Sequence, residues 1–471
     1  MDSFVIDGGR RLSGRVRING SKNAALPILA AALLTTEPIT IRDVPALEDI
    51  ANMLRLLEQL GCAQVPQGAE DAAGTIRLRT TDESLSHAPY EIVRTMRASI
   101  CTLGPLLAKR GYARVSLPGG CAIGERPVDL HIRGLKALGA EITLEAGDII
   151  ARTPQGGLKG ATIFLGGANG STVLGTTNVM CAASLAKGTT IIESAACEPE
   201  VVDLAKLLIS MGAKIQGAGT PRITIEGVDQ LGGTDHTVMA DRIEAGTFMI
   251  AAAITNGDLV LDNCPIDAML APVYWLEAAG VHVQPVAALT TGVGRARGAG
   301  SLSLSSGSPS VSSGGDDPLR KCVRITTDRV LRPVEITTQP HPGFPTDLQA
   351  QLMALLCLAD GNSVVTERIF QDRFLHVAEL SRMGGRLVRQ GPTVIISGVR
   401  ELVGAPVMAS DLRASACLVL AGLAAKGRTV VNRVYHLDRG YERMEERLRS
   451  LGASITRVEE KVAATMCTVP A

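Results

Sequence analysis

Aromatic residues are scarce in this chain of 471 residues: they make up 3% of it, and there is a single Trp. Hydrophobic residues still account for 46%, so a core must be filled by Ala, Leu, Val and Ile. An excess of one charge is also missing, because 47 Lys and Arg balance 47 Asp and Glu. A balanced charge excludes the basic footprint of a nucleic-acid-binding protein. We therefore expect no nucleic-acid partner.

The sequence also lacks a long hydrophobic run. The longest one, residues 24–34, contains a proline and is too short to cross a bilayer. The N-terminal residues MDSFVIDGGRRLSG have no hydrophobic region typical of a secretory signal. Ten cysteines are scattered without CxxC spacing, which is typical of reduced, buried thiols. These absences predict a cytoplasmic globular protein without membrane insertion, large enough to need no disulfide or metal.

One pattern recurs six times along the chain. A helix-like stretch ends in an apolar residue, a glycine follows, and a short alternating strand begins; the glycines are Gly61, Gly139, Gly212, Gly280, Gly384 and Gly452. Glycine suits a left-handed cap after a helix. Upstream lies a very apolar stretch that we expect to form a helix, such as KNAALPILAAALL in the first copy and MRASICTLGPLLA in the second. A strand rich in Thr, Val and Ile follows it in most copies. The pattern predicts an α/β fold of six βαβαββ units, with the apolar helices inside and the sheets outside.

Six units divide most simply into two domains of three, with a hinge near residues 231–240. The interval between Gly280 and Gly384 is longer than the others. It contains GAGSLSLSSGSPSVSSGGDD, residues 298–317, which is rich in Gly and Ser and nearly free of large apolar side chains. This composition predicts a disordered surface insertion.

Residues that bind anions or move protons cluster just ahead of the apolar helices. They are Lys22 and Asn23, Arg94 and Arg97, residues 171–175, Asp241, Arg242 and Glu244, Asp347, and Asp411 with Arg413. Helix N-termini present unpaired N–H groups, so ends that converge would hold a phosphate or diphosphate. Taken singly, each residue is equally well explained as an ordinary helix cap or solvated end.

The segment SLPGGCAIGERPVDLH, residues 116–131, places Cys121 after two glycines and near Arg126. A thiol on an accessible loop near a cation has a lowered pKa and can react. The alternative is an inert cysteine on a mobile loop. His131, at the end of this segment, is better explained as a structural histidine than as a ligand.

Two further clusters carry reactive groups. In HPGFPTDLQAQ, Asp347 stands next to a helix start, where it would accept a proton from a sugar hydroxyl or simply cap the helix. In YHLDRGYERMEERL, Arg439 and Arg443 are four residues apart near a helix start, on one side. An arginine fork suits phosphate or carboxylate. Solvated charge is the alternative, and we favour it for Arg443.

Several segments together resemble the UDP-N-acetylglucosamine 1-carboxyvinyltransferase family of the EPSP synthase superfamily: INGSKNAALP, VRTMRASI, LPGGCAIGERPVDLHI, FPTDLQAQ, DLRASA and YHLDRGYER. The resemblance spans nearly the whole chain except residues 285–328. It implies transfer of the enolpyruvyl group of phosphoenolpyruvate to UDP-N-acetylglucosamine, in peptidoglycan synthesis, without cofactor or metal. It also implies an inside-out α/β barrel, with residues 22–236 as one domain and residues 1–21 and 237–471 as the other.

The resemblance implies a role for each site residue. Lys22, Arg126 and Arg439 would hold the phosphate and carboxylate of phosphoenolpyruvate, with Arg413 in support. Cys121 would protonate C3 and would be the target of the epoxide fosfomycin, and Asp347 would take the proton from the sugar 3′-hydroxyl. The residues implied to contact the sugar nucleotide are Asn23, Arg97, Arg126, Pro127, Val128, Asp129, Leu130, Ser171, Val173, Asp347 and Ile369.

Three alternatives stand beside this interpretation. The sister enzyme acting on shikimate 3-phosphate (3-phosphoshikimate 1-carboxyvinyltransferase) shares fold and chemistry, but it typically has Lys-Ser where this chain has Lys22-Asn23, and it lacks the PGGC loop. A non-catalytic sugar-nucleotide-binding paralogue is disfavoured because every catalytic residue expected from the family is present. A cysteine hydrolase would need a histidine partner for its thiol, and the sequence places no obvious one.

Overall fold

The computed structural model describes residues 2–66, 68, 72–118, 128–168, 170–286, 317, 319–328 and 330–459. Within these residues the chain forms six four-stranded sheets with one recurring connection pattern. In each sheet an outer strand pairs in parallel with its neighbour, and the other pairs are antiparallel. The predicted α/β fold of six βαβαββ units is confirmed.

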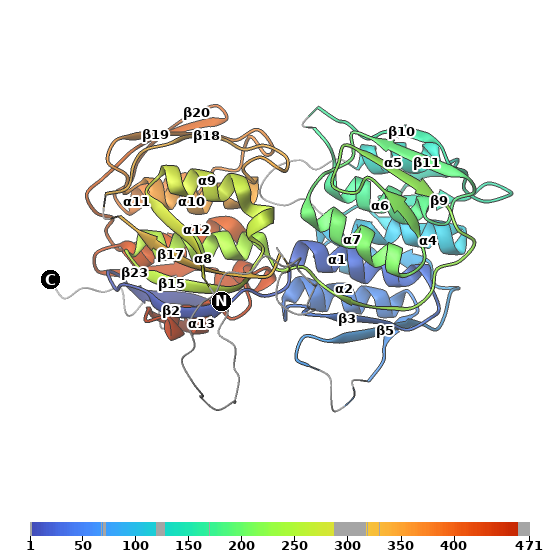
Figure 1. The fold of residues 1–471 in the computed structure, drawn as a ribbon, viewed down its shortest axis with the longest axis horizontal. Coiled ribbons are helices and arrows are strands. Elements are labelled where there is room, and N and C mark those ends of the chain that lie inside the picture. The colour runs from blue at the N-terminus through green and yellow to red at the C-terminus, as the bar shows by residue number, and fades with distance from the viewer. Residues whose placement is uncertain are drawn as a thin grey trace, which may run out of the picture.

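Three sheets belong to what we call the first lobe, on the right in Figure 1. Their strand orders are β14 (Thr234–Thr237), β3 (Ile39–Arg42), β5 (Ile76–Thr80), β4 (Cys62–Gln64); β6 (His87–Ala88), β7 (Tyr112–Ser116), β9 (Asp148–Arg152), β8 (Glu141–Glu145); and β10 (Thr162–Phe164), β11 (Thr189–Glu193), β13 (Arg222–Glu226), β12 (Lys214–Gln216). Strand β14 follows the third unit in the chain, yet it pairs with the first strand of the first unit.

The other three sheets form the second lobe. Their strand orders are β16 (Val281–Val286), β17 (Lys321–Thr327), β15 (Asp258–Cys264), β2 (Ser13–Arg17); β18 (Glu335–Thr337), β19 (Asn362–Thr366), β21 (Thr393–Ser397), β20 (Arg386–Gln390); and β22 (Pro406–Met408), β23 (Arg428–Asn432), β1 (Asp2–Asp7), β24 (Ser454–Glu459). The two N-terminal strands thus complete sheets whose other strands come from the second half of the chain.

Each unit contributes one helix to the interior of its lobe. These helices are α1 (Lys22–Ala31), α4 (Leu103–Arg110) and α6 (Val173–Ala183) in the first lobe, and α8 (Arg242–Ile254), α10 (Gln349–Leu356) and α12 (Leu412–Ala424) in the second. Every residue of α8 is buried, as a helix that is apolar all round requires. The helices α8, α10 and α12 pack against one another, and the sheets cover them (Figure 1).

The second helix of each unit packs closer to the surface, and a glycine ends it. These helices are α2 (Glu48–Gln59), α5 (Asp129–Ala137), α7 (Pro199–Ser210), α9 (Leu270–Ala278), α11 (Leu375–Arg382) and α13 (Met444–Ser450). The six predicted turn glycines all have positive φ, from +75° at Gly61 to +105° at Gly212. Only glycine adopts this backbone without a Cβ penalty, so the predicted left-handed caps are confirmed.

Each lobe has its own large hydrophobic core. One draws on residues from 24 to 239 together with Ala268, and the other on residues 4–18 and 240–455. The chain passes between the lobes twice, and the two crossing segments are hydrogen-bonded to each other. Ser21 N donates to Met239 O, and Asp241 N donates to Asn19 O. This pairing places the start of α1 beside the start of α8.

Two local predictions are wrong. The apolar stretch MRASICTLGPLLA does not form one helix: a 3-10 helix η2 (Arg97–Thr102) precedes α4. Arg439 and Arg443 do not share a helical face, because Arg439 ends the 3-10 helix η5 (Val434–Arg439) and Arg443 precedes α13 with a φ of +43°. The Arg443 side chain is 74% exposed and pairs only loosely with Glu446, at 3.6 Å. The remaining short helices are η1 (Ala32–Leu34), α3 (Tyr90–Val93), η3 (Ile266–Met269) and η4 (Thr346–Leu348).

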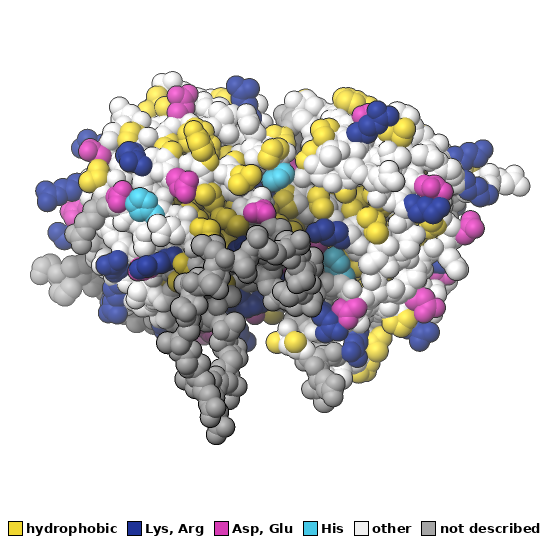
Figure 2. Space-filling model, in the orientation of Figure 1, with side chains coloured by type: hydrophobic (Ala, Val, Ile, Leu, Met, Phe, Trp, Pro, Cys, Tyr) yellow, Lys and Arg dark blue, Asp and Glu magenta, His cyan; other side chains and the backbone are white. Residues whose placement is uncertain are grey.

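The surface charge of the described residues is mixed. On the face drawn in Figure 2, Lys and Arg side chains are interspersed with Asp and Glu over both lobes. Among the helices that the structure describes, none combines the length and apolarity needed to cross a membrane. The predicted insertion at residues 298–317 lies outside the described residues, apart from Asp317.

Candidate active site between the two lobes

Side-chain caps set the starts of four interior helices. Ser21, Thr172, Asp241 and Asp411 accept hydrogen bonds from backbone N–H groups in the first turns of α1, α6, α8 and α12. A cap fixes where a helix begins, and so it fixes the positions of the residues that follow. Lys22 follows the first cap directly, and Arg413 stands two residues after the last.

Lys22 and Arg439 meet at one carboxylate. Lys22 Nζ lies 3.0 Å from Asp49 Oδ2, and Arg439 Nε lies 2.9 Å from Asp49 Oδ1. Asp49 is buried in the first turn of α2, in the first lobe, whereas Arg439 belongs to the second. Burial alone would raise the pKa of Asp49, but the charges of Lys22 and Arg439 outweigh it and hold this pKa below its usual value. Asp49 therefore stays ionised and joins the lobes.

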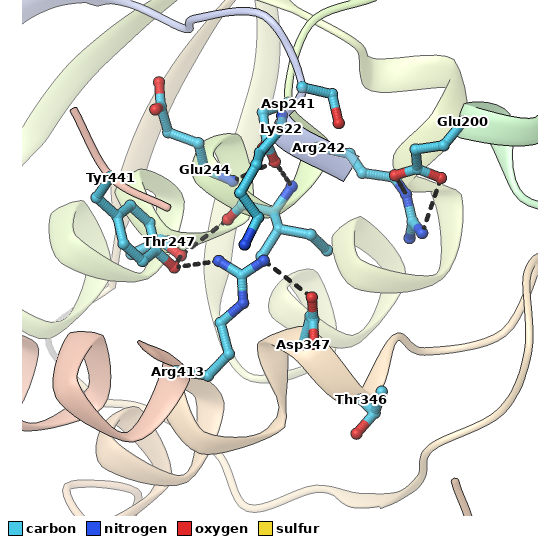
Figure 3. Close-up of polar contacts among 12 residues, drawn as sticks. Lys22, Glu200, Asp241, Arg242, Glu244, Thr247, Thr346, Asp347, Arg413 and Tyr441 are labelled. Atoms are coloured by element: carbon cyan, nitrogen blue, oxygen red, sulfur yellow. Dashed lines mark hydrogen bonds and ion pairs between the residues drawn. The ribbon is translucent and has the colours of Figure 1, made fainter. Parts of the chain in front are cut away.

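Asp241 connects this cluster to the second lobe. Its Oδ1 accepts hydrogen bonds from Ile243 N and Glu244 N, and its Oδ2 accepts one from Lys22 N at 3.4 Å. The negative charge of Asp241 also acts on Arg413, which stands on α12. Figure 3 draws Lys22, Asp241, Arg413 and Asp347 within one close-up of the site. Four candidate residues from different elements, Lys22, Asp241, Asp347 and Arg413, are thereby brought together.

Both oxygens of the Asp347 carboxylate are held by guanidinium groups. Arg373 Nη1 donates to Oδ1 at 2.7 Å, and Arg413 Nη2 donates to Oδ2 at 2.8 Å. Burial would raise the pKa of Asp347, but these two cations hold it well below its usual value. Burial is the largest single influence on the pKa of Arg413 and lowers it, but the combined effects of Asp347, Tyr441 and Asp241 hold this pKa above its usual value. A carboxylate in this state is ionised, and it is a weak base until one cation withdraws.

The loop that carries Ile369 is organised by a buried glutamate. Glu367 accepts hydrogen bonds from Thr338 Oγ1 at 2.6 Å and Thr346 Oγ1 at 2.8 Å. It also accepts them from the backbone N–H groups of Ile369 and Phe370. One side chain therefore fixes the half-buried Ile369 relative to Asp347, which follows Thr346 in the chain.

Two charged residues in the first turn of α8 form ion pairs with residues of other helices. Arg242 Nε lies 2.9 Å from Glu200 Oε1, and Glu244 Oε1 lies 2.9 Å from Arg447 Nη1. Figure 3 shows the Arg242 and Glu200 side chains facing each other. His341 N donates to Glu198 Oε1 at 3.3 Å, from the second lobe to the first. These partners hold the lobes and helices in place, which matches the structural alternative that we left open for such residues.

Most of the described residues that were predicted to contact a sugar nucleotide lie in the first lobe; Asp347 and Ile369 lie in the second. Val128 precedes α5, and Asp129 and Leu130 begin it. Leu130 packs against Gly167, which pairs with Gly170, directly before Ser171 in the chain. Val173 is the first residue of α6. Arg97 begins η2, and its charge, with burial as the larger cause, lowers the pKa of His131 on α5 to about 3. Asn23 is half-buried at the start of α1.

His131 is structural, as predicted. It is buried, and its Nδ1 lies 2.8 Å from Asn178 Nδ2 on α6. Cys121, Arg126 and Pro127 lie outside the described residues. The eight described cysteines are all free thiols, and six of them are buried, as predicted. Among the described residues, no group of three His, Cys, Asp or Glu side chains is placed to hold a metal ion.

Several residues of the site were not predicted from the sequence: Asp49, Gln351, Glu367, Arg373 and Tyr441. Tyr441 and Gln351 stand inside segments that the family resemblance singled out, YHLDRGYER and FPTDLQAQ. No spacing links Asp49 to Lys22 or Arg439, because these contacts join separate elements. The acid pair in LEDI, where Asp49 starts a helix, was the only local signal.

A family model and solved structures identify the class of protein. Residues 6–448 match the family model described as EPSP synthase (3-phosphoshikimate 1-carboxyvinyltransferase). The solved enolpyruvyl transferase NikO from Streptomyces tendae shares the fold, with a TM-score of 0.80 at 24% identity over 97% of this chain and 99% of that one. An EPSP synthase from Acinetobacter baumannii has a TM-score of 0.71 at 17% identity, over 98% of this chain and 100% of that one. The fold is that of the enolpyruvyl transferases.

Curated relatives narrow the class. A protein named UDP-N-acetylglucosamine 1-carboxyvinyltransferase from Anaeromyxobacter sp. (strain Fw109-5) is 51% identical over 457 residues, 97% of this chain and 99% of that protein. A protein of the same name from Methylacidiphilum infernorum (isolate V4) is 50% identical over 98% of this chain and 100% of that one. The chain belongs to the UDP-N-acetylglucosamine 1-carboxyvinyltransferase family of enzymes, as its signature segments predicted.

Proposed function

We propose that this enzyme transfers the enolpyruvyl group of phosphoenolpyruvate to the 3′-hydroxyl of UDP-N-acetylglucosamine and releases inorganic phosphate. The observation that carries the proposal is the sequence similarity over nearly the full length, at 51% and 50% identity, to relatives named for this reaction. The cluster of cations around Asp49 and Asp347 supports it, because phosphoenolpyruvate brings a phosphate and a carboxylate that need such partners.

Lys22 and Arg439 act on the phosphate in this proposal. Asp49 holds them side by side, so their charges are oriented before the substrate arrives. Preorganised cations stabilise the negative charge that develops on departing phosphate, and they do so without reorganising during the reaction. Arg126, on the segment outside the described residues, completes the set that the family resemblance implies.

Asp347 is the base in this proposal, and substrate binding activates it. In the free enzyme its two oxygens are bound by Arg373 and Arg413. The carboxylate of phosphoenolpyruvate competes for Arg413, and the loss of one cation raises the proton affinity of Asp347. The base is thereby strengthened only when phosphoenolpyruvate is bound.

Addition and elimination then follow with balanced protons. The 3′-oxygen bonds to C2 of phosphoenolpyruvate, its proton passes to Asp347, and the Cys121 thiol protonates C3. The resulting tetrahedral ketal loses phosphate when the bond from C2 to the phosphate oxygen breaks and its electron pair stays on that oxygen. The departing phosphate takes up the proton that Asp347 accepted, so Asp347 is ionised again. A proton leaves C3 for the Cys121 thiolate, and the enol double bond is restored.

Contacts to the sugar nucleotide come chiefly from the first lobe. The assigned residues are Asn23, Arg97, Arg126, Pro127, Val128, Asp129, Leu130, Ser171 and Val173, with Ile369 from the second lobe. The packing of Leu130 against Gly167 supports one continuous contact surface from α5 to α6. We assign residues 22–236 to one domain and residues 1–21 and 237–471 to the other, supported by the two separate cores.

The proposal places the enzyme in the cytoplasm, at the first committed step of peptidoglycan synthesis. Cell shape and cell division would therefore depend on it, and fosfomycin would inactivate it through Cys121. The reaction as proposed needs no cofactor.

One assay tests the function. Phosphate release from phosphoenolpyruvate is measured with UDP-N-acetylglucosamine and, separately, with shikimate 3-phosphate. Release with the first acceptor alone is expected. Release with shikimate 3-phosphate alone would assign the sister activity, and release with neither would favour a non-catalytic binding protein.

A further inference from the structure

Tyr441 is a buried phenol that the reaction described above does not use. It lies between η5 and α13 in the second lobe, and its side chain reaches the interior helices α8, α10 and α12. Its hydroxyl lies 3.1 Å from Arg413 Nη1, 2.9 Å from Thr247 Oγ1 and 3.2 Å from Gln351 Nε2. Figure 3 shows Arg413 between this hydroxyl on one side and Asp347 on the other.

The direction of each hydrogen bond can be worked out. Thr247 Oγ1 donates its only proton to Ile243 O at 2.8 Å, so Thr247 must accept from Tyr441. The Tyr441 proton is then committed to Thr247, and both lone pairs of the phenol oxygen remain as acceptors. They face Arg413 and Gln351. Tyr441 is thus held as an acceptor toward the guanidinium.

Gln351 extends the network to the backbone of the proposed base. Its Nε2 also donates to Asp347 O at 2.9 Å. A main-chain carbonyl only accepts hydrogen bonds, so the amide must present its NH2 group toward Asp347 and Tyr441. The phenol is therefore linked to Asp347 by two routes, through the Arg413 side chain and through the Gln351 amide.

Packing adds a second restraint on Arg413. The guanidinium carbon lies 5.4 Å from the centre of the Tyr441 ring, within the range of a cation–π contact. Tyr441 and Arg413 are both buried, so water cannot readily replace the hydrogen bond or the cation–π contact between them. Loss of the phenol oxygen would leave an Arg413 N–H without its acceptor in a dry site, which favours a shifted guanidinium.

We propose that Tyr441 is a positioning residue that sets the distance between Arg413 and Asp347, with Gln351 as its link to the Asp347 backbone. This inference rests on the proposed function, since it assigns Arg413 to the carboxylate of phosphoenolpyruvate. Tyr441 does not touch substrate; it holds the guanidinium where it can pass from Asp347 to phosphoenolpyruvate.

The test compares Tyr441→Phe with Tyr435→Phe in the full-length enzyme. Tyr435 stands in the neighbouring 3-10 helix η5, is 45% exposed and packs on His436, so it controls for the substitution itself. For Tyr441→Phe we expect kcat to fall about tenfold to hundredfold and KM for phosphoenolpyruvate to rise about tenfold. The Kd for UDP-N-acetylglucosamine, measured by calorimetry, stays within about twofold, because that ligand contacts other elements.

If Tyr441 had only a structural role, its loss would not weaken phosphoenolpyruvate binding while leaving UDP-N-acetylglucosamine binding unchanged. Equal losses for both substrates, or kinetics unchanged from the wild type, would overturn the proposal. If Tyr441→Phe is insoluble, Gln351→Leu must raise KM for phosphoenolpyruvate while leaving the Kd for UDP-N-acetylglucosamine unchanged. Failure to do so would equally refute the proposal. If the wild type acts only on shikimate 3-phosphate, the proposed function fails. Tyr441→Phe is then tested by comparing KM for phosphoenolpyruvate with the Kd for shikimate 3-phosphate.

Discussion

Arg439 Nε lies 2.9 Å from Asp49 Oδ1, although the two residues are 390 positions apart in the chain. The contact joins the second lobe to the first, and Asp49 also binds Lys22 through its other oxygen. A single buried carboxylate thus balances two cations that would otherwise repel each other. The same carboxylate therefore orients the two cations that we propose bind phosphate and connects the two lobes.

Asp49→Asn keeps the size of the side chain and removes its charge. We expect the free energy of unfolding to fall by about 2 kcal/mol, because two cations lose a buried partner. KM for phosphoenolpyruvate should rise about tenfold, since Lys22 and Arg439 are no longer oriented. Urea unfolding and steady-state kinetics measure the two effects.

Glu48→Gln is the matched control, because Glu48 is the neighbouring residue and pairs with Arg55 in an exposed contact. Exposed pairs contribute little, so stability and KM should stay near the wild-type values. Equal behaviour of Asp49→Asn and Glu48→Gln would show that Asp49 does not organise the site.

Stability should decline in acid for a defined reason. Burial raises the pKa values of Asp49 and Asp347, but their cationic partners lower them by more than burial raises them. Both pKa values therefore lie below the usual 3.8. A carboxylate with a lowered folded-state pKa stabilises the protein above its unfolded pKa, and this stability is lost as pH falls through the folded value. Urea midpoints should therefore decrease below about pH 4. Asp49→Asn should show a shallower decrease, and an identical slope would contradict the pairing.

Asp347→Ala removes the proposed base. Turnover should fall by about a hundredfold to ten-thousandfold, the usual contribution of general base catalysis, while UDP-N-acetylglucosamine still binds. The matched control is Asp372→Ala, because Asp372 is 81% exposed and contacts Arg389. Phosphate release and calorimetric titration separate the two effects. Turnover close to the wild type would refute the base assignment.

Cys121→Ser should abolish inactivation by fosfomycin. Burial raises the pKa values of the two half-buried thiols that the structure describes, Cys197 and Cys322, so they should not compete as nucleophiles. Mass spectrometry of the wild type should find one adduct, on the peptide that contains Cys121. Cys197→Ser should leave the adduct in place, whereas alkylation of Cys121→Ser at the wild-type rate would identify another thiol as the target.

Gly212→Ala tests the turn that ends α7. A Cβ at this position would meet no atom within 4 Å, but φ is +105°. Any loss is therefore backbone strain, and we expect about 1 kcal/mol in the free energy of unfolding, with unchanged kinetics. Gly212→Asn should lose less, because asparagine tolerates positive φ better. No loss in either variant would mean that the cap adds nothing to stability.

The glycine turns, the interior helices and the six βαβαββ units could be predicted because each depends on neighbours in the sequence. The break between η2 and α4 could not, since both stretches are equally apolar and only packing separates them. The pairing predicted for Arg439 and Arg443 failed for a similar reason. The chain turns between them, at Gly440 and at the left-handed backbone of Arg443.

Short-range patterns in the sequence determined the repeating unit, the interior helices and the left-handed turns, and the signature segments determined the family. Tertiary structure alone decided that Asp49 joins Lys22 to Arg439, that Arg373 and Arg413 both bind Asp347, and that Tyr441 supports Arg413. The physical reason is that a carboxylate's proton affinity depends on charges a few ångströms away. Folding brings those charges together from elements hundreds of residues apart, and no local spacing records which of them will meet.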